Sequence, residues 1–141
     1  MRTRAIRYHD FSAGHRVVGH ESKCANLHGH NYRVFFECER ELEPLDVVGR
    51  VIDFSVMKTA LCEWLELEWD HRLLISHADP WATSLRAVDP TVVIVPFNPT
   101  AENMARYLLL DVGPENLEGT DVQLIGVTVE ETRKCSARVF L

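Results

Sequence analysis

The chain has 141 residues, of which 46% are hydrophobic and 26% are charged, as is typical of a folded globular protein. This length fits one core, so we expect a single domain over residues 1–141. The formal net charge of −6 argues against a nucleic-acid-binding protein, and the apolar runs are too short to cross a membrane. Because the N-terminus lacks a signal peptide and the four cysteines contain no CxxC pair, we expect a cytoplasmic protein with reduced thiols.

Alternating apolar and polar residues predict two strands in the first part of the chain. The first begins over residues 4–9 and ends near His15, and the second covers residues 31–40. One face of the second strand is expected to be drier than the other. That face carries Tyr32, Val34, Phe36 and Cys38.

Two helices are expected in the middle of the chain. Asp53 or Ser55 caps the first, in which apolar residues recur at helical spacing until Trp69. Thr100 caps the second, and Gly113 is expected to end it. Residues 76–99 lie between the two helices and contain four prolines, so we expect them to be mostly irregular, with one short apolar run.

Two more strands, over residues 122–131 and 137–141, complete the prediction. One face of the first is expected to carry Ile125, Val127, Val129 and Glu131. The order strand, strand, helix, helix, strand, strand predicts an α+β fold in which two helices pack on one face of an antiparallel sheet. With only four or five strands, the other face and the edges need cover, which favours an oligomer.

A possible metal site lies where the second strand begins. His28 and His30 are two residues apart, so in a strand both imidazoles project from the same face and reach one ion. Gly29 removes bulk between them, and His15 would lie opposite the pair if the two strands are antiparallel. Three neutral imidazoles suit zinc and leave a fourth position open for water or substrate, as in catalytic zinc sites.

Other interpretations of these residues remain open. An H-x-H pair also arises by chance or serves hydrogen bonding, and His20 and Cys24 are competing ligands. A closed site that includes Cys24 would be structural zinc in a protein that is not an enzyme. Asp70 beside His71 suits a proton shuttle, although such a pair is more often a helix end and a surface histidine. Glu131 on an apolar strand face lies either at the margin of the sheet or in a ligand site.

Six short motifs follow one another along the chain. They are Phe11-Ser-Ala-Gly-His15, Cys24-x3-His28-Gly-His30-Asn-Tyr32, Gly49-Arg-Val-Ile-Asp53-Phe54, Asp70-His71, Asn98-Pro-Thr100-Ala-Glu102 and Glu131-Thr132. In order and spacing they resemble the family of 6-pyruvoyltetrahydropterin and 6-carboxytetrahydropterin synthases over nearly the whole chain. The resemblance implies the tunnelling fold, in which sheets of several subunits join into a barrel. It also implies a homo-hexamer of two stacked trimers with the sites between subunits.

The resemblance further implies a role for each candidate residue. The implied Zn²⁺ ligands are His15, His28 and His30, the catalytic residues are Cys24, Asp70 and His71, and the pterin-binding residues are Glu131, Thr100 and Glu102. Cys24 would move protons at the substrate side chain and would have to be partly thiolate to do so. The Glu131 carboxylate would accept hydrogen bonds from the pterin ring.

The activity that the resemblance implies is that of a zinc-dependent lyase acting on 7,8-dihydroneopterin triphosphate. In the bacterial branch, the products are 6-carboxytetrahydropterin, acetaldehyde and triphosphate, on the route to queuosine and other deazapurines. The alternative is a 6-pyruvoyltetrahydropterin synthase, which eliminates triphosphate from the same substrate. A pterin-binding module or a structural zinc protein is the non-enzyme alternative. Cys24 argues against the branch in which glutamate replaces this cysteine.

Two features are less well defined by the resemblance. Candidates for binding the triphosphate are, by position only, Arg16, Lys23, Arg133 and Lys134. The segment over residues 76–96 is longer than its counterpart in compact bacterial members, and could reshape the rim of the pocket.

Overall fold

A long antiparallel pair of strands forms the centre of the sheet. The computed structural model describes residues 1–141. In it, β1 (Ala5–His15) pairs with β2 (His28–Arg40) over its full length, from Ala5 opposite Cys38 to His15 opposite His28. The antiparallel pairing that the sequence predicts is therefore confirmed, and it brings the histidines to one end of the sheet.

The complete sheet has six strands in the order β4-β3-β1-β2-β5-β6. Strand β5 (Val122–Glu130) pairs with β2, and β6 (Ser136–Phe140) pairs with β5, both antiparallel. On the other side, β3 (Arg72–Ser76) runs parallel to β1, and β4 (Val93–Val95) runs parallel to β3.

The sheet therefore has six strands where four or five were predicted, and its β1–β3 and β3–β4 pairings are parallel, whereas an antiparallel sheet was predicted. The chain crosses the sheet as a helix between β2 and β3, and such a crossover makes parallel pairing possible. Strands of five and three residues are too short to show a clear alternation in the sequence. The segment expected to be mostly irregular also contains a short helix, α3 (Ala82–Val88).

The first predicted helix is confirmed, with the cap at Asp53. It runs without interruption through α1 (Phe54–Met57), the π-helical turn η2 (Lys58–Cys62) and α2 (Glu63–Glu68). The Asp53 side chain accepts a hydrogen bond of 2.8 Å from the amide of Ser55, which satisfies one of the free N–H groups at the helix start.

The second predicted helix begins as expected but ends later. Thr100 caps α4 (Ala101–Tyr107) by accepting from the Asn103 amide at 3.2 Å. The helix then continues through η3 (Leu108–Val112) and α5 (Gly113–Asn116), so the stop predicted at Gly113 is wrong. A Cβ at Gly113 would lie 2.5 Å from a Leu124 methyl carbon. This glycine allows the helix to pack closely on β5 instead of ending it.

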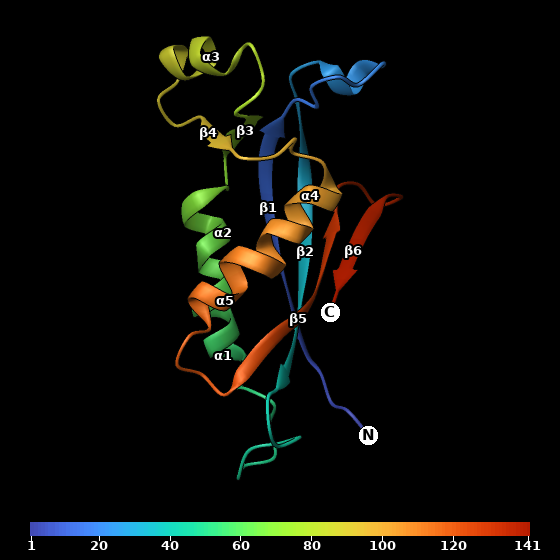
Figure 1. Ribbon diagram of the computed structural model, residues 1–141, viewed down its shortest axis with the longest axis vertical. Coiled ribbons are helices and arrows are strands. Elements are labelled where there is room, and N and C mark those ends of the chain that lie inside the picture. The colour runs from blue at the N-terminus through green and yellow to red at the C-terminus, as the bar shows by residue number, and fades with distance from the viewer.

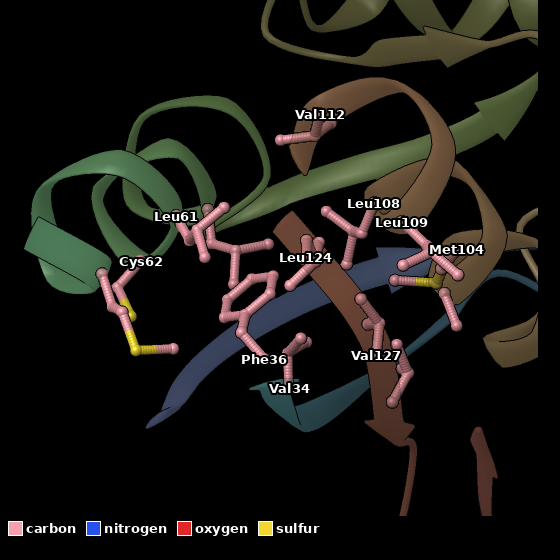
Figure 2. Close-up of a cluster of buried hydrophobic side chains, with 14 of the residues drawn as sticks. Val34, Phe36, Leu61, Cys62, Met104, Leu108, Leu109, Val112, Leu124 and Val127 are labelled. Carbon is pink, nitrogen blue, oxygen red and sulfur yellow. The ribbon is translucent and has the colours of Figure 1, made fainter. Parts of the chain in front are cut away.

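The helices cover one face of the sheet and enclose the core. Figure 1 shows α4 crossing in front of β1 and β2, with α1, α2 and α5 beside them. The main core contains 25 buried residues, and Figure 2 shows how Phe36 and Val34 meet Leu61, Leu108 and Val127 there. The dry face predicted for β2 is confirmed, since none of its four apolar residues is more than 1% exposed. No helix is both long enough and apolar enough to span a membrane.

A β-bulge changes the predicted face of β5. Opposite β2, Glu37 pairs with Gly126 but Cys38 pairs with Leu124, so Ile125 is an extra residue in the ladder. One extra residue reverses the alternation of faces beyond it. As a result Leu124, not Ile125, joins Val127 in the main core, and the predicted grouping of Ile125 with this face is wrong.

Candidate functional site

Three histidines converge at the end of the β1–β2 pair. The register places His15 opposite His28 and Ala13 opposite His30. One ligand nitrogen from each histidine lies within 4.8 Å of the others, and the Nε2 atoms of His15 and His28 are 3.1 Å apart. The arrangement can hold a metal ion, because all three imidazoles come from neighbouring rigid strands.

Hydrogen bonds orient two of these imidazoles. Nδ1 of His15 lies 2.6 Å from the carbonyl oxygen of Pro99, and Nδ1 of His28 lies 2.7 Å from that of Asn26. A carbonyl oxygen only accepts, so each Nδ1 carries the proton and donates, and each Nε2 presents its lone pair to the centre. Contacts of this kind are typical of histidines that bind metals. Burial lowers the pKa of His15 despite the Pro99 carbonyl, which favours the neutral form that a metal requires.

The third histidine supports the same interpretation. Nε2 of His30 is buried without a hydrogen-bond partner, and a buried polar atom without a partner is costly. Two Nε2 lone pairs 3.1 Å apart also repel each other unless a cation lies between them. Nitrogen ligands about 2.0–2.1 Å from a tetrahedral ion are about 3.3 Å apart. The three residues therefore fit a metal ion.

Glu131 lies at the edge of the histidine cluster, just after β5. Its Oε1 is 3.5 Å from Nε2 of His15 and 3.6 Å from Nε2 of His30. The side chain is 27% exposed, so the carboxylate is in contact both with the histidines and with solvent. The structure thus places the carboxylate at the end of β5, beside the histidine cluster.

A pocket of about 440 Å³ next to Glu131 brings together most of the other predicted residues. Its lining includes Cys24, Thr100, Glu102 and Glu131, together with Val17, His20 and Cys135. Cys24 is half-buried in a short helical turn, η1 (Lys23–Ala25), within the loop between β1 and β2. The pocket therefore has one wall from this loop and another from the start of α4.

Asp70 and His71 lie together, but in a different cleft. This cleft of about 920 Å³ also reaches His30 and Glu131, whereas Cys24 does not line it. Oδ2 of Asp70 lies 2.9 Å from Nδ1 of His71, and Oδ1 of Asp70 accepts a hydrogen bond from the Ser12 amide at 3.0 Å. Burial raises the pKa of Asp70, but these hydrogen bonds outweigh it and lower the pKa below its usual value.

The backbone of His71 adopts an unusual conformation. Its φ is +59°, and its side chain is 81% exposed. A non-glycine residue at positive φ is strained, and such strain is found preferentially at functional sites. The His71 amide donates to the carbonyl of Ser12 at 2.6 Å, which helps to hold the ring out towards solvent. A single chain thus forms the Asp70–His71 pair without bringing it into the Cys24 pocket.

The four basic residues considered for triphosphate binding differ in whether they form an ion pair within the chain. Arg16 forms an ion pair of 2.9 Å with Asp79, whose side chain is fully buried, so its charge is already balanced within the chain. Lys23, Arg133 and Lys134 form no ion pair within 4.0 Å. Of the four candidates for the triphosphate, these three stay available.

Sequence reasoning did not identify the residues that support the site. The carbonyl groups of Pro99 and Asn26 belong to the backbone. Every residue has such a group, so the sequence does not indicate which ones bind the histidines. Asn98 was part of a recognised motif without a role, and its side chain is hydrogen-bonded to the backbone of Val18 at 3.0 and 2.9 Å.

Comparison with known proteins identifies the family. The family model for 6-pyruvoyl tetrahydropterin synthase matches residues 5–140, so the chain belongs to this family. The 6-carboxy-5,6,7,8-tetrahydropterin synthase of Rickettsia felis is 32% identical over 133 residues, with 92% of this chain and 94% of that protein covered. A probable 6-carboxy-5,6,7,8-tetrahydropterin synthase of Halobacterium salinarum is 35% identical, covering 96% and 83%.

Solved structures agree with the fold. An uncharacterized protein from Wolinella succinogenes superposes with a TM-score of 0.82 at 24% identity, over 98% of this chain and 97% of that one. The 6-pyruvoyl tetrahydropterin synthase of Caenorhabditis elegans has a TM-score of 0.69 at 25% identity, over 99% and 95%. The α+β class predicted from the sequence is therefore confirmed.

Proposed function

We propose that the protein is a 6-carboxy-5,6,7,8-tetrahydropterin synthase, which converts 7,8-dihydroneopterin triphosphate to 6-carboxytetrahydropterin, acetaldehyde and triphosphate. The observation that carries the proposal is the three-histidine cluster with a carboxylate, Glu131, between it and the Cys24 pocket. Relatives of this name align with more than nine-tenths of the chain, which supports this product over the pyruvoyl one.

The proposed cofactor is Zn²⁺ held by His15, His28 and His30. Bound there, zinc would act as a Lewis acid that polarises the side-chain hydroxyls of the substrate and acidifies the adjacent C–H groups. Glu131 lies beside the Nε2 atoms of His15 and His30 and also lines the Cys24 pocket, so the substrate would approach the cluster from that pocket.

The other residues divide between binding and proton transfer. Glu131 would accept hydrogen bonds from the N–H groups of the pterin edge, while Thr100 and Glu102 line the same pocket. Cys24 would take a proton from the substrate side chain, which requires its thiolate form. The carboxylate of Asp70 lies 2.9 Å from Nδ1 of His71 and would hold the ring there, so His71 would exchange a proton at Nε2, the nitrogen left free.

The separation of Cys24 from His71 supports an oligomeric site. We propose a homo-hexamer of two trimers, in which the Asp70–His71 pair of one subunit approaches Cys24 of its neighbour. The sheet face opposite the helices leaves Ile6, Tyr8 and Phe140 more than half exposed, and large exposed apolar side chains on an uncovered sheet favour association.

Direct turnover tests the proposed reaction. The zinc-loaded protein is incubated with 7,8-dihydroneopterin triphosphate, the pterin product is identified by mass spectrometry, and acetaldehyde is assayed. We expect 6-carboxytetrahydropterin and acetaldehyde in equal amounts. A diketo pterin without acetaldehyde would instead identify a 6-pyruvoyltetrahydropterin synthase, and no turnover of any kind would contradict an enzymatic role.

Mixing two inactive variants tests the shared site. Cys24→Ala and His71→Ala should each keep the metal and lose turnover. If the two residues act from different subunits, dissociating and reassembling an equal mixture should restore about one quarter of the parent activity, because one site in four then contains both residues. A mixture that stays inactive, although mass spectrometry shows mixed oligomers, would place both residues in the same chain.

A further inference from the structure

The loop between β1 and β2, residues 16–27, carries Cys24 but contains almost no regular structure. Apart from the turn η1, it is held by isolated hydrogen bonds, among them the Val17 amide donating to the Cys24 carbonyl at 2.9 Å. Contacts that hold Val17 and the residues next to it in place therefore also hold the backbone of Cys24 in place.

Asn98 attaches this loop to the other wall of the pocket. Its Oδ1 accepts from the Val18 amide at 3.0 Å, and its Nδ2 donates to the Val18 carbonyl at 2.9 Å. A side-chain amide is suited to this, because it offers a donor and an acceptor side by side, as a peptide group does. The carbonyl of Asn98 in turn accepts from Nδ2 of Asn103 in α4 at 3.0 Å.

A second anchor comes from the long 76–96 segment. The Arg16 guanidinium forms the ion pair with buried Asp79 and lies 3.4 Å from the centre of the Trp81 ring. Asp79 also accepts from the Trp81 amide at 2.8 Å, so the carboxylate and the ring are fixed relative to each other. Arg16 directly follows His15, and the segment thus holds the loop at the point where it leaves the histidine cluster.

We propose that Asn98 is a positioning residue for Cys24, and that the Arg16–Asp79 pair is its second anchor. Together they set the distance across the pocket between the thiol and the residues at the start of α4. As a role in catalysis, this inference rests on the proposed function. In this proposal, the 76–96 segment provides the buried carboxylate and the aromatic ring that hold Arg16.

The test compares two Asn98 variants with a matched control. Asn98→Ala removes both hydrogen bonds, and Asn98→Asp places an oxygen opposite the Val18 carbonyl. The control is Asn116→Ala, because Asn116 also donates from its side chain to a backbone carbonyl, that of Val112 at 2.8 Å, but lies in α5. For each protein, metal content, kcat, KM and the rate of alkylation of Cys24 by iodoacetamide are measured, with the Cys135 peptide as an internal reference.

In both Asn98 variants we expect full metal content and a Cys24 alkylation rate raised about fivefold or more relative to Cys135, because the loop opens locally. We expect kcat to fall by about tenfold to a hundredfold, with a smaller change in KM, because a catalytic group displaced by about 1 Å loses rate on this scale. The control should match the parent in every readout.

Two results would overturn the proposal. One is parental alkylation and kcat in both Asn98 variants, and the other is loss of metal, which would place the effect of Asn98 at His15 through Pro99. If neither variant folds, Asp79→Asn decides by the same readouts, with a smaller change expected in the same direction. Alkylation needs no substrate, so a parent protein without turnover would refute the proposed function and leave this readout intact.

Discussion

The helix-covered face of the sheet and its histidine end use opposite kinds of contact. In the core, Phe36, Leu61 and Leu108 are fully buried and belong to one cluster of apolar side chains (Figure 2). At the histidine end, His30 has a buried nitrogen without a partner, and the nitrogens of His15 and His28 face each other. The first region contributes stability, whereas the second gives up stability to leave polar atoms open for a ligand.

This comparison predicts that the two regions fail differently when they are changed. A substitution in the core should lower stability and leave the chemistry of the site in place. A substitution at the histidine end should remove metal or substrate and leave the fold in place.

The largest expected effect is at the metal site. His28→Ala removes one of three ligands, and the remaining two should leave less than about a tenth of the parent zinc content at neutral pH. The matched control is His20→Ala, since His20 lines the Cys24 pocket and is not part of the histidine cluster. Zinc is measured by atomic absorption after dialysis. Parental zinc in His28→Ala, or loss of zinc in His20→Ala, would assign the ligands differently.

A substitution in the core should lower the free energy of unfolding without changing metal binding. Leu108→Ala removes a side chain that is fully buried, and the loss of burial and the resulting cavity should cost about 2–5 kcal/mol in free energy of unfolding. Leu110→Ala in the same helix is the control, because Leu110 is 52% exposed and should change stability by less than about 0.5 kcal/mol. Urea denaturation measures both. If zinc binding by folded Leu108→Ala is also lost, the two regions are not separable.

Glu131 should affect ligand affinity without affecting the metal. Glu131→Gln keeps the shape but turns an acceptor into a donor facing the pterin N–H groups, so a dihydropterin should bind about tenfold more weakly or worse, ~1.4 kcal/mol. Glu130→Gln is the control and should change the affinity by less than about twofold. Calorimetric titration compares the three proteins, and equal affinities would remove Glu131 from the pterin site.

On the opposite sheet face, the expected effect depends on pH. Buried Glu37 accepts from Arg138 at 2.8 and 2.9 Å, and chiefly for this reason its pKa lies below the usual 4.5. A carboxyl with a lowered pKa stabilises the fold above its unfolded-state pKa, and this contribution is lost as pH falls through the folded-state pKa. Glu37→Gln should therefore cost about 1–3 kcal/mol at pH 7. The gap to the parent should shrink in urea titrations at progressively lower pH, and a gap independent of pH would contradict the charge-based explanation.

Features that depend on neighbours in sequence were predicted well. The caps at Asp53 and Thr100 involve contacts to residues two and three positions ahead. The dry face of β2 follows from strict alternation, and the pairing of His15 with the two other histidines needs only an antiparallel hairpin.

Features that depend on distant residues were predicted poorly. Gly113 suggests a helix end by its type alone, but its role depends on Leu124 of β5. The bulge at Ile125 follows from the register against β2, and β3 and β4 are too short to show a period.

By itself, the sequence determined which residues have metal-binding and proton-transfer chemistry, and the family to which they point, because donor atoms and motif spacing are properties of the chain. Tertiary structure decided which of them meet. Cys24 and Glu131 line one pocket, and Asp70 and His71 line another. Arg16 forms an ion pair with Asp79, and Asn98 forms a hydrogen bond with Val18. In three of these four cases the partners lie 63 or more residues apart in the sequence, and only the packing of the helices and strands brings side chains at such separations close together.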